Sequence, residues 1–501
     1  PGPSLSLLRS LVTLCVLCNL KWTRAFNLVG VARFGPFVAS RSNHVRMSLV
    51  FPQDVSELLV EAGFDAKRLL RIGEKLNTPA ATCLRVNTLR ADVKRISHEL
   101  EEHCIATSGF KPTIVSHPVL PECLILAPRF NATFSEAAED IVNHVSRERV
   151  VLVGRLCGEA VLQGADVFAP GVAAVPFDLQ EGETVAVFAD TTDCVQRGGV
   201  TAGRNPKASD IVVTPENSVL VGRGVARMER GGIFGRKPAG VAVEMTERQW
   251  DAPSLSAWNE DVCMLQTLPA AVVAHVVDPQ PGERVLDMCA APGGKSTHMA
   301  QLMGDQGVVV ACDRTQKKID EIGHLARRLG LQSVQPMQAD ATCCVERGVV
   351  EACSFDRVLL DPPCSALGLR PSLRVGGVSA WSKAQSRQTT AQNLRSLPSY
   401  QRRMLYEANA ALKPGGRLVL STCTLNPLEN EATVAWAQQR LGLEVQTQEG
   451  VRVGGPGMSV HGLSQEDASR LQRFLPGEDN WANDNVDSFT GFFIACFRKP
   501  L

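Results

Sequence analysis

The chain has 501 residues and a formal net charge of +0, and 44% of its residues are apolar and 21% charged. This length is too great for one ordinary domain and predicts two or three, while the composition is typical of a soluble globular protein. The balanced charge excludes the overall basic character of many nucleic-acid-binding proteins, so RNA binding would have to use local basic patches.

The 16 cysteines form no regular framework. The only C-x-x-C pair, Cys15 and Cys18, lies in an apolar stretch, and neither a second such pair nor a nearby pair of histidines completes a zinc site. We therefore expect no metal, and a reducing compartment in which most cysteines are small core residues.

Residues 1–46 precede the first methionine, Met47, and allow two interpretations. The apolar stretch Leu11–Leu20 is too short to span a bilayer, but it suits a targeting peptide, since the segment up to Asn43 contains no acidic residue. Alternatively the segment is dispensable. We expect no membrane contact and a cytoplasmic location, or an organelle if the segment is a targeting peptide.

Residues 47–140 carry helix and strand patterns, which predict an α/β N-terminal extension. Apolar residues recur at Val55, Leu58, Leu59 and Ala62, which is the spacing of one helix face. The stretch Cys83–Arg90 is typical of a short strand that ends in a turn.

Residues 141–245 alternate short β-branched runs with Gly and Pro turns, which predicts a small all-β barrel. Strands are expected at Val150–Val153, Ala160–Leu162, Thr184–Phe188 and Ser218–Val221. The polar, Gly-rich stretch Thr191–Asp210 is expected to be a loop.

Residues 246–501 alternate strands with helical stretches, and this pattern predicts βαβ units with a parallel sheet. Helices are expected at Gln316–Leu329 and Tyr400–Leu412. The expected strands are Arg284–Met288, Val308–Cys312, Val334–Met337, Arg357–Leu360, Arg417–Ser421 and Phe489–Phe497.

A Gly-rich turn, Cys289–Lys295, follows the first of these strands, where ligands bind in open α/β sheets. Its spacing does not fit a phosphate-binding loop. The second strand ends at Asp313, which suits two ribose hydroxyls, and the third ends at Asp340, which suits an adenine amino group. Each acid alone could be a solvated turn residue, but together they favour a nucleoside cofactor without polyphosphate, such as S-adenosylmethionine.

Two cysteines end the fourth and fifth strands, in Asp361-Pro-Pro-Cys364 and Ser421-Thr-Cys423. Neighbouring parallel strands would bring both to one cleft. A thiolate that adds to carbon 6 of a cytosine makes carbon 5 nucleophilic enough to accept a methyl group. Asp361 could hold a proton near N3 if burial raises its pKa. The alternative is that both cysteines are buried apolar fillers.

Residues from about Cys83 to Leu501 resemble the NOP/Sun family of RNA cytosine-5 methyltransferases. The matching stretches are L-R-V-N-T-L at Leu84, L-D-M-C-A-A-P-G-G-K-S-T-H at Leu286, D-P-P-C-S-A-L-G at Asp361, Y-Q-R-R-M-L at Tyr400, L-K-P-G-G-R-L-V-L-S-T-C-T at Leu412, N-P-L-E-N-E at Asn426 and G-F-F-I-A-C-F at Gly491. Together these motifs are highly specific.

The resemblance implies that Cys423 is the nucleophile and that Cys364 helps to release the product. Because DNA cytosine methyltransferases use the cysteine of the P-C motif as nucleophile, the presence of both cysteines indicates RNA and not DNA. Asp361 and Lys295 complete the implied catalytic set. The implied cofactor contacts are Cys289, Ala290, Ala291, Pro292, Gly293, Gly294, Lys295, Asp313, Lys318, Asp340 and Asp361.

Gly158–Gly171 and Val221–Gly224 resemble a PUA RNA-binding domain, which one branch of the family carries. This branch methylates a cytosine near the 3′ end of certain tRNAs and hairpin-loop cytosines in some messenger RNAs. The PUA domain would hold the single-stranded C-C-A end, where Phe168 could stack on a base or be a core aromatic.

The resemblance thus implies a Rossmann-like class I methyltransferase domain at 246–501 with a PUA domain inserted at 141–245, in a monomer. Two loops limit it, Thr191–Asp210 and Arg370–Ser399, since either could alter substrate choice. The main alternative is an inactive RNA-binding or assembly factor with the same fold, and a DNA methyltransferase is a second one.

Overall fold

A computed structural model describes residues 51–501 apart from 110, 146–147, 202–209, 215–216, 256–257, 374–389, 449 and 479–485. The expected targeting segment, 1–46, lies outside the described residues, as do most of the Arg370–Ser399 loop and residues 202–209 of the other loop. Within the described ranges, no helix combines the length and apolar character that crossing a bilayer requires.

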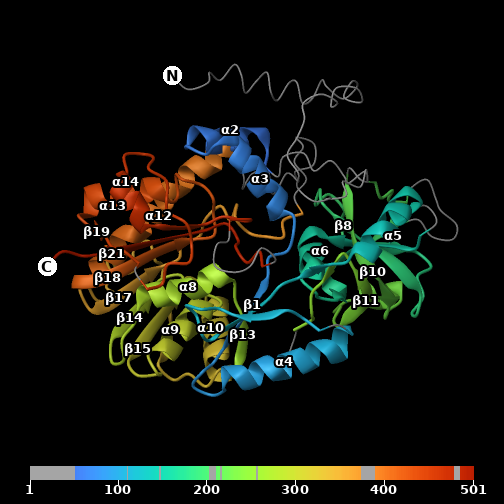
Figure 1. Ribbon diagram of the computed structural model, residues 1–501, viewed down its shortest axis with the longest axis horizontal. Coiled ribbons are helices and arrows are strands. Elements are labelled where there is room, and N and C mark those ends of the chain that lie inside the picture. The colour runs from blue at the N-terminus through green and yellow to red at the C-terminus, as the bar shows by residue number, and fades with distance from the viewer. Residues whose placement is uncertain are drawn as a thin grey trace, which may run out of the picture. The chain divides into compact units, whose positions relative to one another are not determined.

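An eight-stranded sheet organises the C-terminal half (Figure 1), and seven of its strands follow the order β16-β15-β14-β17-β18-β21-β19. The five from β16 to β18 are parallel, whereas β21 runs antiparallel to β18, and β19 and β20 each pair antiparallel with β21. The strands are β14 (Arg284–Asp287), β15 (Val308–Asp313), β16 (Val334–Gln338), β17 (Phe355–Leu360), β18 (Leu412–Thr422), β19 (Glu444–Val445), β20 (Gln472–Phe474) and β21 (Phe492–Arg498). The predicted parallel sheet is confirmed; the last strand begins three residues later than expected, at Phe492.

Helices pack on both faces of this sheet, because its strands are apolar on both sides. One core cluster joins the sheet to α8, α9 and α10, and a second joins it to α12 and α13. The helices are α8 (Leu268–Val277), α9 (Gly294–Leu302), α10 (Gln316–Arg328), α12 (Ala391–Ala411), α13 (Glu431–Leu441) and α14 (Gln465–Arg470). The helix expected at Tyr400–Leu412 is the second half of α12. Because α12 begins at Ala391, the expectation of a loop over Arg370–Ser399 is wrong for residues 391–399, which are helical.

The N-terminal extension has its own four-stranded sheet, in the order β13-β1-β3-β2. Val55, Leu58 and Leu59 are buried on α2, and Ala62, which follows its last residue, is buried as well, which confirms the predicted helix. The expected strand at Cys83 is β1. The elements are α2 (Gln53–Glu61), α3 (Ala66–Leu76), β1 (Thr82–Val86), α4 (Val93–Ser108), β2 (Ile114–Ser116), β3 (Cys123–Leu126) and, from later in the chain, β13 (Cys263–Leu265).

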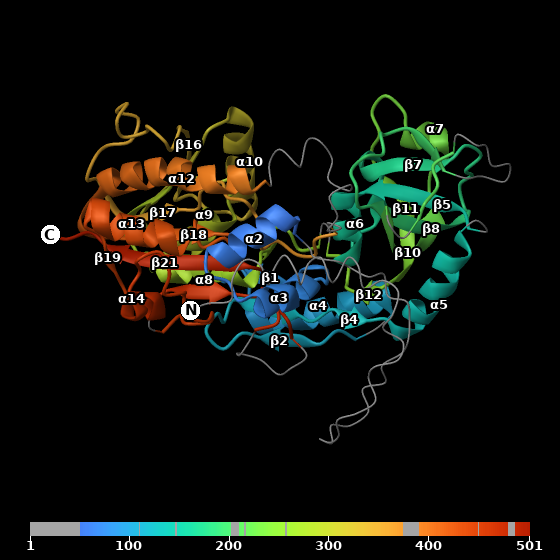
Figure 2. The same cartoon turned by 90° about the horizontal axis from the view of Figure 1, so that it is seen from above.

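The region between β3 and β13 forms a seven-stranded mixed sheet, in the order β6-β11-β10-β8-β5-β7-β9 (Figure 2). Its strands are β5 (Val150–Gly154), β6 (Val167–Phe168), β7 (Val172–Pro176), β8 (Thr184–Asp190), β9 (Gly199–Thr201), β10 (Ser218–Ala226) and β11 (Val241–Arg248). The helices are α5 (Ala132–Asn143), α6 (Arg155–Leu162), the short 3-10 helix η2 (Ala169–Gly171) and α7 (Arg230–Ile233), and β4 (Arg129–Phe130) pairs with β12 (Trp250–Asp251).

The strand predicted at Ala160–Leu162 is wrong, because these residues end helix α6. Gly158, Val161 and Leu162 are buried along one face of the helix, and a Cβ at Gly158 would lie 2.3 Å from the Cβ of Ala189 on β8. This close approach fixes the segment as a packed helix, although its short apolar run resembles those of the neighbouring strands. The region is therefore not all-β. The loop expected at Thr191–Asp210 also contains β9.

Candidate active site

The carboxyl ends of β17 and β18 meet at one edge of the sheet. Leu360 and Leu420 are paired in the parallel register, so the residues that follow, Asp361 and Ser421, lie side by side, and the Ser421 hydroxyl donates to Asp361 Oδ1 at 2.8 Å. This confirms the expectation that the fourth and fifth strands are neighbours.

The two predicted cysteines face each other across this edge. The Sγ atoms of Cys364 and Cys423 lie 3.3 Å apart, and both side chains are half-buried. The hydrogen bond from Cys364 lowers the pKa of the Cys423 thiol, although burial opposes this, and the same bond with burial raises the pKa of Cys364. The pair therefore holds one negative charge most readily on Cys423.

Charged neighbours act on both sulfur atoms. Asp361 raises the pKa of Cys423 more than Lys295 lowers it, and Glu429 raises the pKa of Cys364. Glu429 is fully buried and ties the loop after Cys364 in place, because it accepts hydrogen bonds from the backbone N–H and hydroxyl of Ser365 at 3.0 and 2.5 Å.

Lys295 and Asp361 form an ion pair, with Nζ 2.6 Å from Oδ2. Burial opposes the charged lysine, but the Asp361 carboxylate outweighs it and raises the pKa of Lys295. Both Asp361 oxygens thus accept, one from Lys295 and one from Ser421. Asp361 is thus placed as a hydrogen-bond acceptor with the Lys295 ammonium as a donor beside it, and its expected protonation stays a prediction.

The Gly-rich turn lies between the ends of β14 and β15, at the start of α9. Gly293 has a φ of +107°, which only glycine adopts readily, and it precedes the first residue of α9. Asp313 accepts from the Ala291 N–H at 3.3 Å and pairs with Lys318 Nζ at 2.9 Å. The turn residues Cys289–Gly294, Asp313 and Lys318 are thus brought together.

Asp340 follows β16, and its Oδ1 accepts from the N–H and hydroxyl of Thr342 at 3.0 and 2.7 Å. These bonds lower the pKa of Asp340 and keep it ionised. Asp313 and Asp340 therefore lie at the carboxyl ends of two successive strands, β15 and β16, which is the arrangement predicted for a nucleoside cofactor.

Asp287 and Glu429 are functional candidates that sequence reasoning did not single out, although both lie inside the matched motifs. Asp287 ends β14, accepts from the Ser296 hydroxyl at 2.7 Å through Oδ2, and is fully buried, which raises its pKa to about 6. Its Oδ1 is enclosed by protein, and the backbone of Cys289, at the start of the Gly-rich turn, acts on the carboxylate through a hydrogen bond. Asp287 therefore connects the end of β14 to the turn and to Ser296 on α9.

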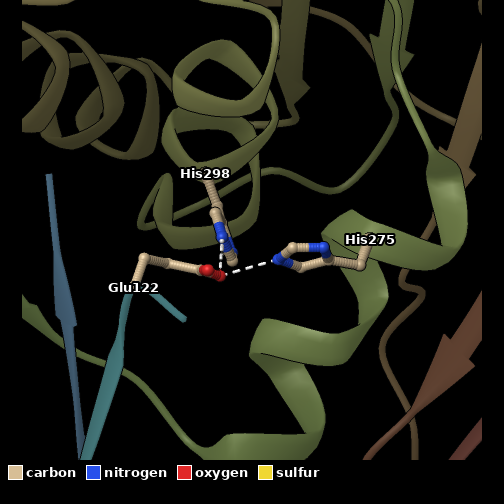
Figure 3. A group of neighbouring side chains, drawn as sticks. All are labelled: Glu122, His275 and His298. Carbon is tan, nitrogen blue, oxygen red and sulfur yellow. Dashed lines mark hydrogen bonds and ion pairs between the residues drawn. The ribbon is translucent and has the colours of Figure 1, made fainter. Parts of the chain in front are cut away.

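A buried group with metal-ligand side chains lies outside this edge. Glu122, His275 and His298 converge from three separate elements (Figure 3), and the Nε2 atoms of the two histidines lie 2.7 and 2.9 Å from Glu122 Oε1. The sequence did not predict it, because Glu122 and His298 lie 176 residues apart.

The chain is similar to several known proteins. The family model described as 16S rRNA methyltransferase RsmB/F matches residues 274–498. The tRNA (cytosine(72)-C(5))-methyltransferase NSUN6 of Mus musculus is 35% identical over 86% of this chain and 89% of its own length. The tRNA (cytosine(72)-C(5))-methyltransferase of Pyrococcus horikoshii is 31% identical over 90% and 97%.

A solved structure of NSun6 from Pyrococcus horikoshii with SFG, an analogue of S-adenosylmethionine, is also similar. Its TM-score is 0.68 at 29% identity, and the match covers 90% of this chain and 98% of that one. The similarity therefore extends over the extension, the seven-stranded lobe and the eight-stranded sheet together.

Proposed function

The chain belongs to the NOP/Sun (RsmB/F) family of RNA cytosine-5 methyltransferases, and from this premise we propose that it methylates carbon 5 of a cytosine near the 3′ acceptor end of tRNA, with Cys423 as the nucleophile. The observation that carries the proposal is the Cys364–Cys423 pair, 3.3 Å apart, beside the Lys295–Asp361 ion pair.

The cofactor is S-adenosylmethionine, which supplies a methyl group on a sulfonium when bound. The residues that would hold it are Asp313 and Asp340 for the nucleoside and the turn Cys289–Gly294 with Lys318 beside it. The chemistry of these residues supports this assignment, since carboxylates at strand ends suit the hydroxyl and amino groups of a nucleoside, and the backbone at Gly293 lets a ligand approach the turn closely.

Cys423 begins the reaction on the base. Its thiolate forms a bond to carbon 6, the electron pair of the 5,6 double bond moves toward N3, and carbon 5 becomes nucleophilic. Negative charge on the ring is offset by a proton from the Lys295 ammonium, which Asp361 orients through the 2.6 Å ion pair.

Cys364 acts at the end of the reaction. After carbon 5 carries the methyl group, its hydrogen leaves as a proton to water, the 5,6 double bond reforms, the bond from Cys423 to carbon 6 breaks with its electron pair on sulfur, and the N3 proton returns to Lys295. Cys364 is held within 3.3 Å of the leaving sulfur, and its raised pKa keeps it a thiol that donates a hydrogen bond to the released Cys423 thiolate.

The substrate assignment rests on relatives that are named for cytosine 72 of tRNA and on the seven-stranded lobe. We propose that this lobe, residues 141–245, is a PUA domain that binds the C-C-A end. Phe168 is 46% exposed, which favours stacking on a base over a place in the core. Hairpin-loop messenger RNA is a further candidate, and the monomeric state and cytoplasmic location stay predictions.

The test is incubation with labelled S-adenosylmethionine and either tRNA or duplex DNA, followed by detection of 5-methylcytosine. We expect product with tRNA alone. Cys364→Ala should accumulate a covalent RNA adduct, Cys423→Ala should form none, and Cys353→Ala, at an exposed cysteine, serves as the control. Adducts with Cys423→Ala and none with Cys364→Ala would reverse the two roles. A protein that binds tRNA but makes no product would be an inactive RNA-binding factor.

A further inference from the structure

The segment L-R-V-N-T-L, residues 84–89, lies in the N-terminal extension and has no part in the chemistry above. We propose that this segment holds helix α9, which begins at the Gly-rich turn, in place. Arg85 is then a positioning residue, which fixes Lys295 and the turn where S-adenosylmethionine binds. The proposal deepens the proposed function, since it rests on cofactor binding at that turn.

Helix α9 is buried on all sides, yet it carries a stripe of polar groups. Gly294, Thr297, His298 and Gln301 follow the i, i+3, i+4, i+7 spacing of one helix face. Buried polar groups must find hydrogen-bond partners, and each of these four has one in the extension. The stripe is therefore a docking face and not part of an apolar core.

Arg85 binds the first turn of α9. Its guanidinium donates to Gly294 O at 2.6 Å and to the Thr297 hydroxyl at 2.9 Å through its two terminal nitrogens, and to Gln266 at 2.9 Å. The side chain is 1% exposed. Burial lowers the pKa of Arg85 to about 10, so it remains charged at neutral pH. A planar fork that reaches two residues of one helix turn fixes both position and rotation of that helix.

The two residues held by Arg85 flank Lys295. Because Lys295 lies between Gly294 and Thr297 in the same turn, a shift of this turn moves its ammonium away from Asp361. Close packing also holds this turn against the extension, since a Cβ at Gly294 would lie 2.9 Å from Cε of Met264 on β13. The amide of Gln301 adds a third point by donating to Val86 O at 2.9 Å, one turn further on.

Glu122 supplies the remaining contact, through His298 (Figure 3). Burial opposes its charge, but hydrogen bonds from His275 and His298 hold the pKa of Glu122 well below its usual range. Burial lowers the pKa of His298 to about 3, so its ring is neutral and donates through Nε2. Arg85 acts electrostatically on Glu122 and balances its charge.

A metal ion at Glu122, His275 and His298 is the alternative for this group. A metal-bound histidine almost always donates its second ring N–H to a partner, and His298 Nδ1 is buried with no hydrogen-bond partner among the described residues. A dication would also add positive charge beside the buried Arg85. The hydrogen-bonded arrangement therefore fits these residues better.

The experiment compares Arg85→Lys with Arg90→Lys, a control directly after the segment, where the exposed arginine donates to the carbonyl oxygens of Asp261 and Arg328. Calorimetry measures the Kd for S-adenosylmethionine, and filter binding measures the Kd for tRNA. Lysine keeps the charge but not the fork, so we expect S-adenosylmethionine to bind about tenfold more weakly, as loss of one hydrogen bond to a charged group implies. Binding of tRNA should change less than about twofold, and Arg90→Lys should change neither.

A double-mutant cycle tests the contact itself. Thr297→Val removes the hydroxyl that Arg85 binds, so Arg85→Lys combined with Thr297→Val should weaken cofactor binding little more than Arg85→Lys alone. If Arg85→Lys fails to fold, Gln301→Met gives the same comparison, because it removes the bond to Val86 and keeps a similar volume.

Unchanged cofactor affinity, additive effects in the cycle, or an equal loss of tRNA affinity would overturn the proposal. So would one zinc ion per chain whose chelation abolishes cofactor binding. These measurements do not depend on methylation: a wild-type protein that binds S-adenosylmethionine but methylates no RNA would refute the proposed function and leave the role of Arg85 standing on its own result.

Discussion

Replacement of Cys364 by alanine should slow the alkylation of Cys423 as well as trap the RNA adduct. The 3.3 Å contact with Cys364 is the largest influence that lowers the pKa of Cys423. A hydrogen bond to a charged group contributes ~1.5–3 kcal/mol, and each ~1.4 kcal/mol is tenfold in the thiolate population. The rate of alkylation by iodoacetamide at neutral pH should therefore fall about tenfold or more.

The assay is mass spectrometry of the peptide that contains Cys423, with samples taken over time and across a pH series. The rate should rise with pH in both proteins, because the thiolate is the nucleophile, but the rise should come at higher pH in Cys364→Ala. Cys364→Ser keeps a hydroxyl donor, so its alkylation rate should lie between those of the wild type and Cys364→Ala. The rate of Cys353→Ala should equal that of the wild type. An equal or faster rate in Cys364→Ala would refute the reasoning.

Three further predictions concern stability. Arg473→Met should lower the free energy of unfolding, measured with denaturant, by ~3–5 kcal/mol, because it leaves the Glu431 carboxylate buried without its arginine partner. Adding Glu431→Leu to this variant should restore part of the lost stability. Gly368→Ala should lower the Tm, since a Cβ there would lie 1.8 Å from Gly491 O. Because folding lowers the pKa of Glu122, the ionised Glu122 contributes to the free energy of unfolding above about pH 4.5, and this contribution is lost as the pH falls. The wild type should therefore lose stability on acidification more steeply than Glu122→Gln.

The parallel sheet and its loops could be predicted from the sequence because their signals are local. Each strand is a short apolar run, and Cys364 and Cys423 each follow such a run, so one assumption about strand order was enough to bring the two sulfur atoms together. The measured 3.3 Å contact confirms that order.

Contacts between distant segments could not be predicted in the same way. Arg85 meets Gly294 across 209 residues, and no local pattern in the extension points to α9. The strand predicted at Ala160–Leu162 is wrong for a related reason: its apolar run suits a strand, but the close packing of Gly158 on β8 makes it part of a helix. The ion pair between Asp361 and Lys295 could not be predicted either, because it joins the end of β17 to the first turn of α9.

The two cysteines show why position along a strand does not by itself assign a role. Both follow parallel strands at the same edge, and by sequence either could be the nucleophile. Their surroundings distinguish them: the contact with Cys364 lowers the pKa of Cys423, and the buried side chain of Glu429 raises the pKa of Cys364. The Lys295–Asp361 pair acts on Cys423 in both directions, since the carboxylate raises its pKa and the ammonium lowers it. Because α9 carries Lys295 and Arg85 binds the turn that holds it, the positioning role proposed for Arg85 extends to the balance of charge beside Cys423.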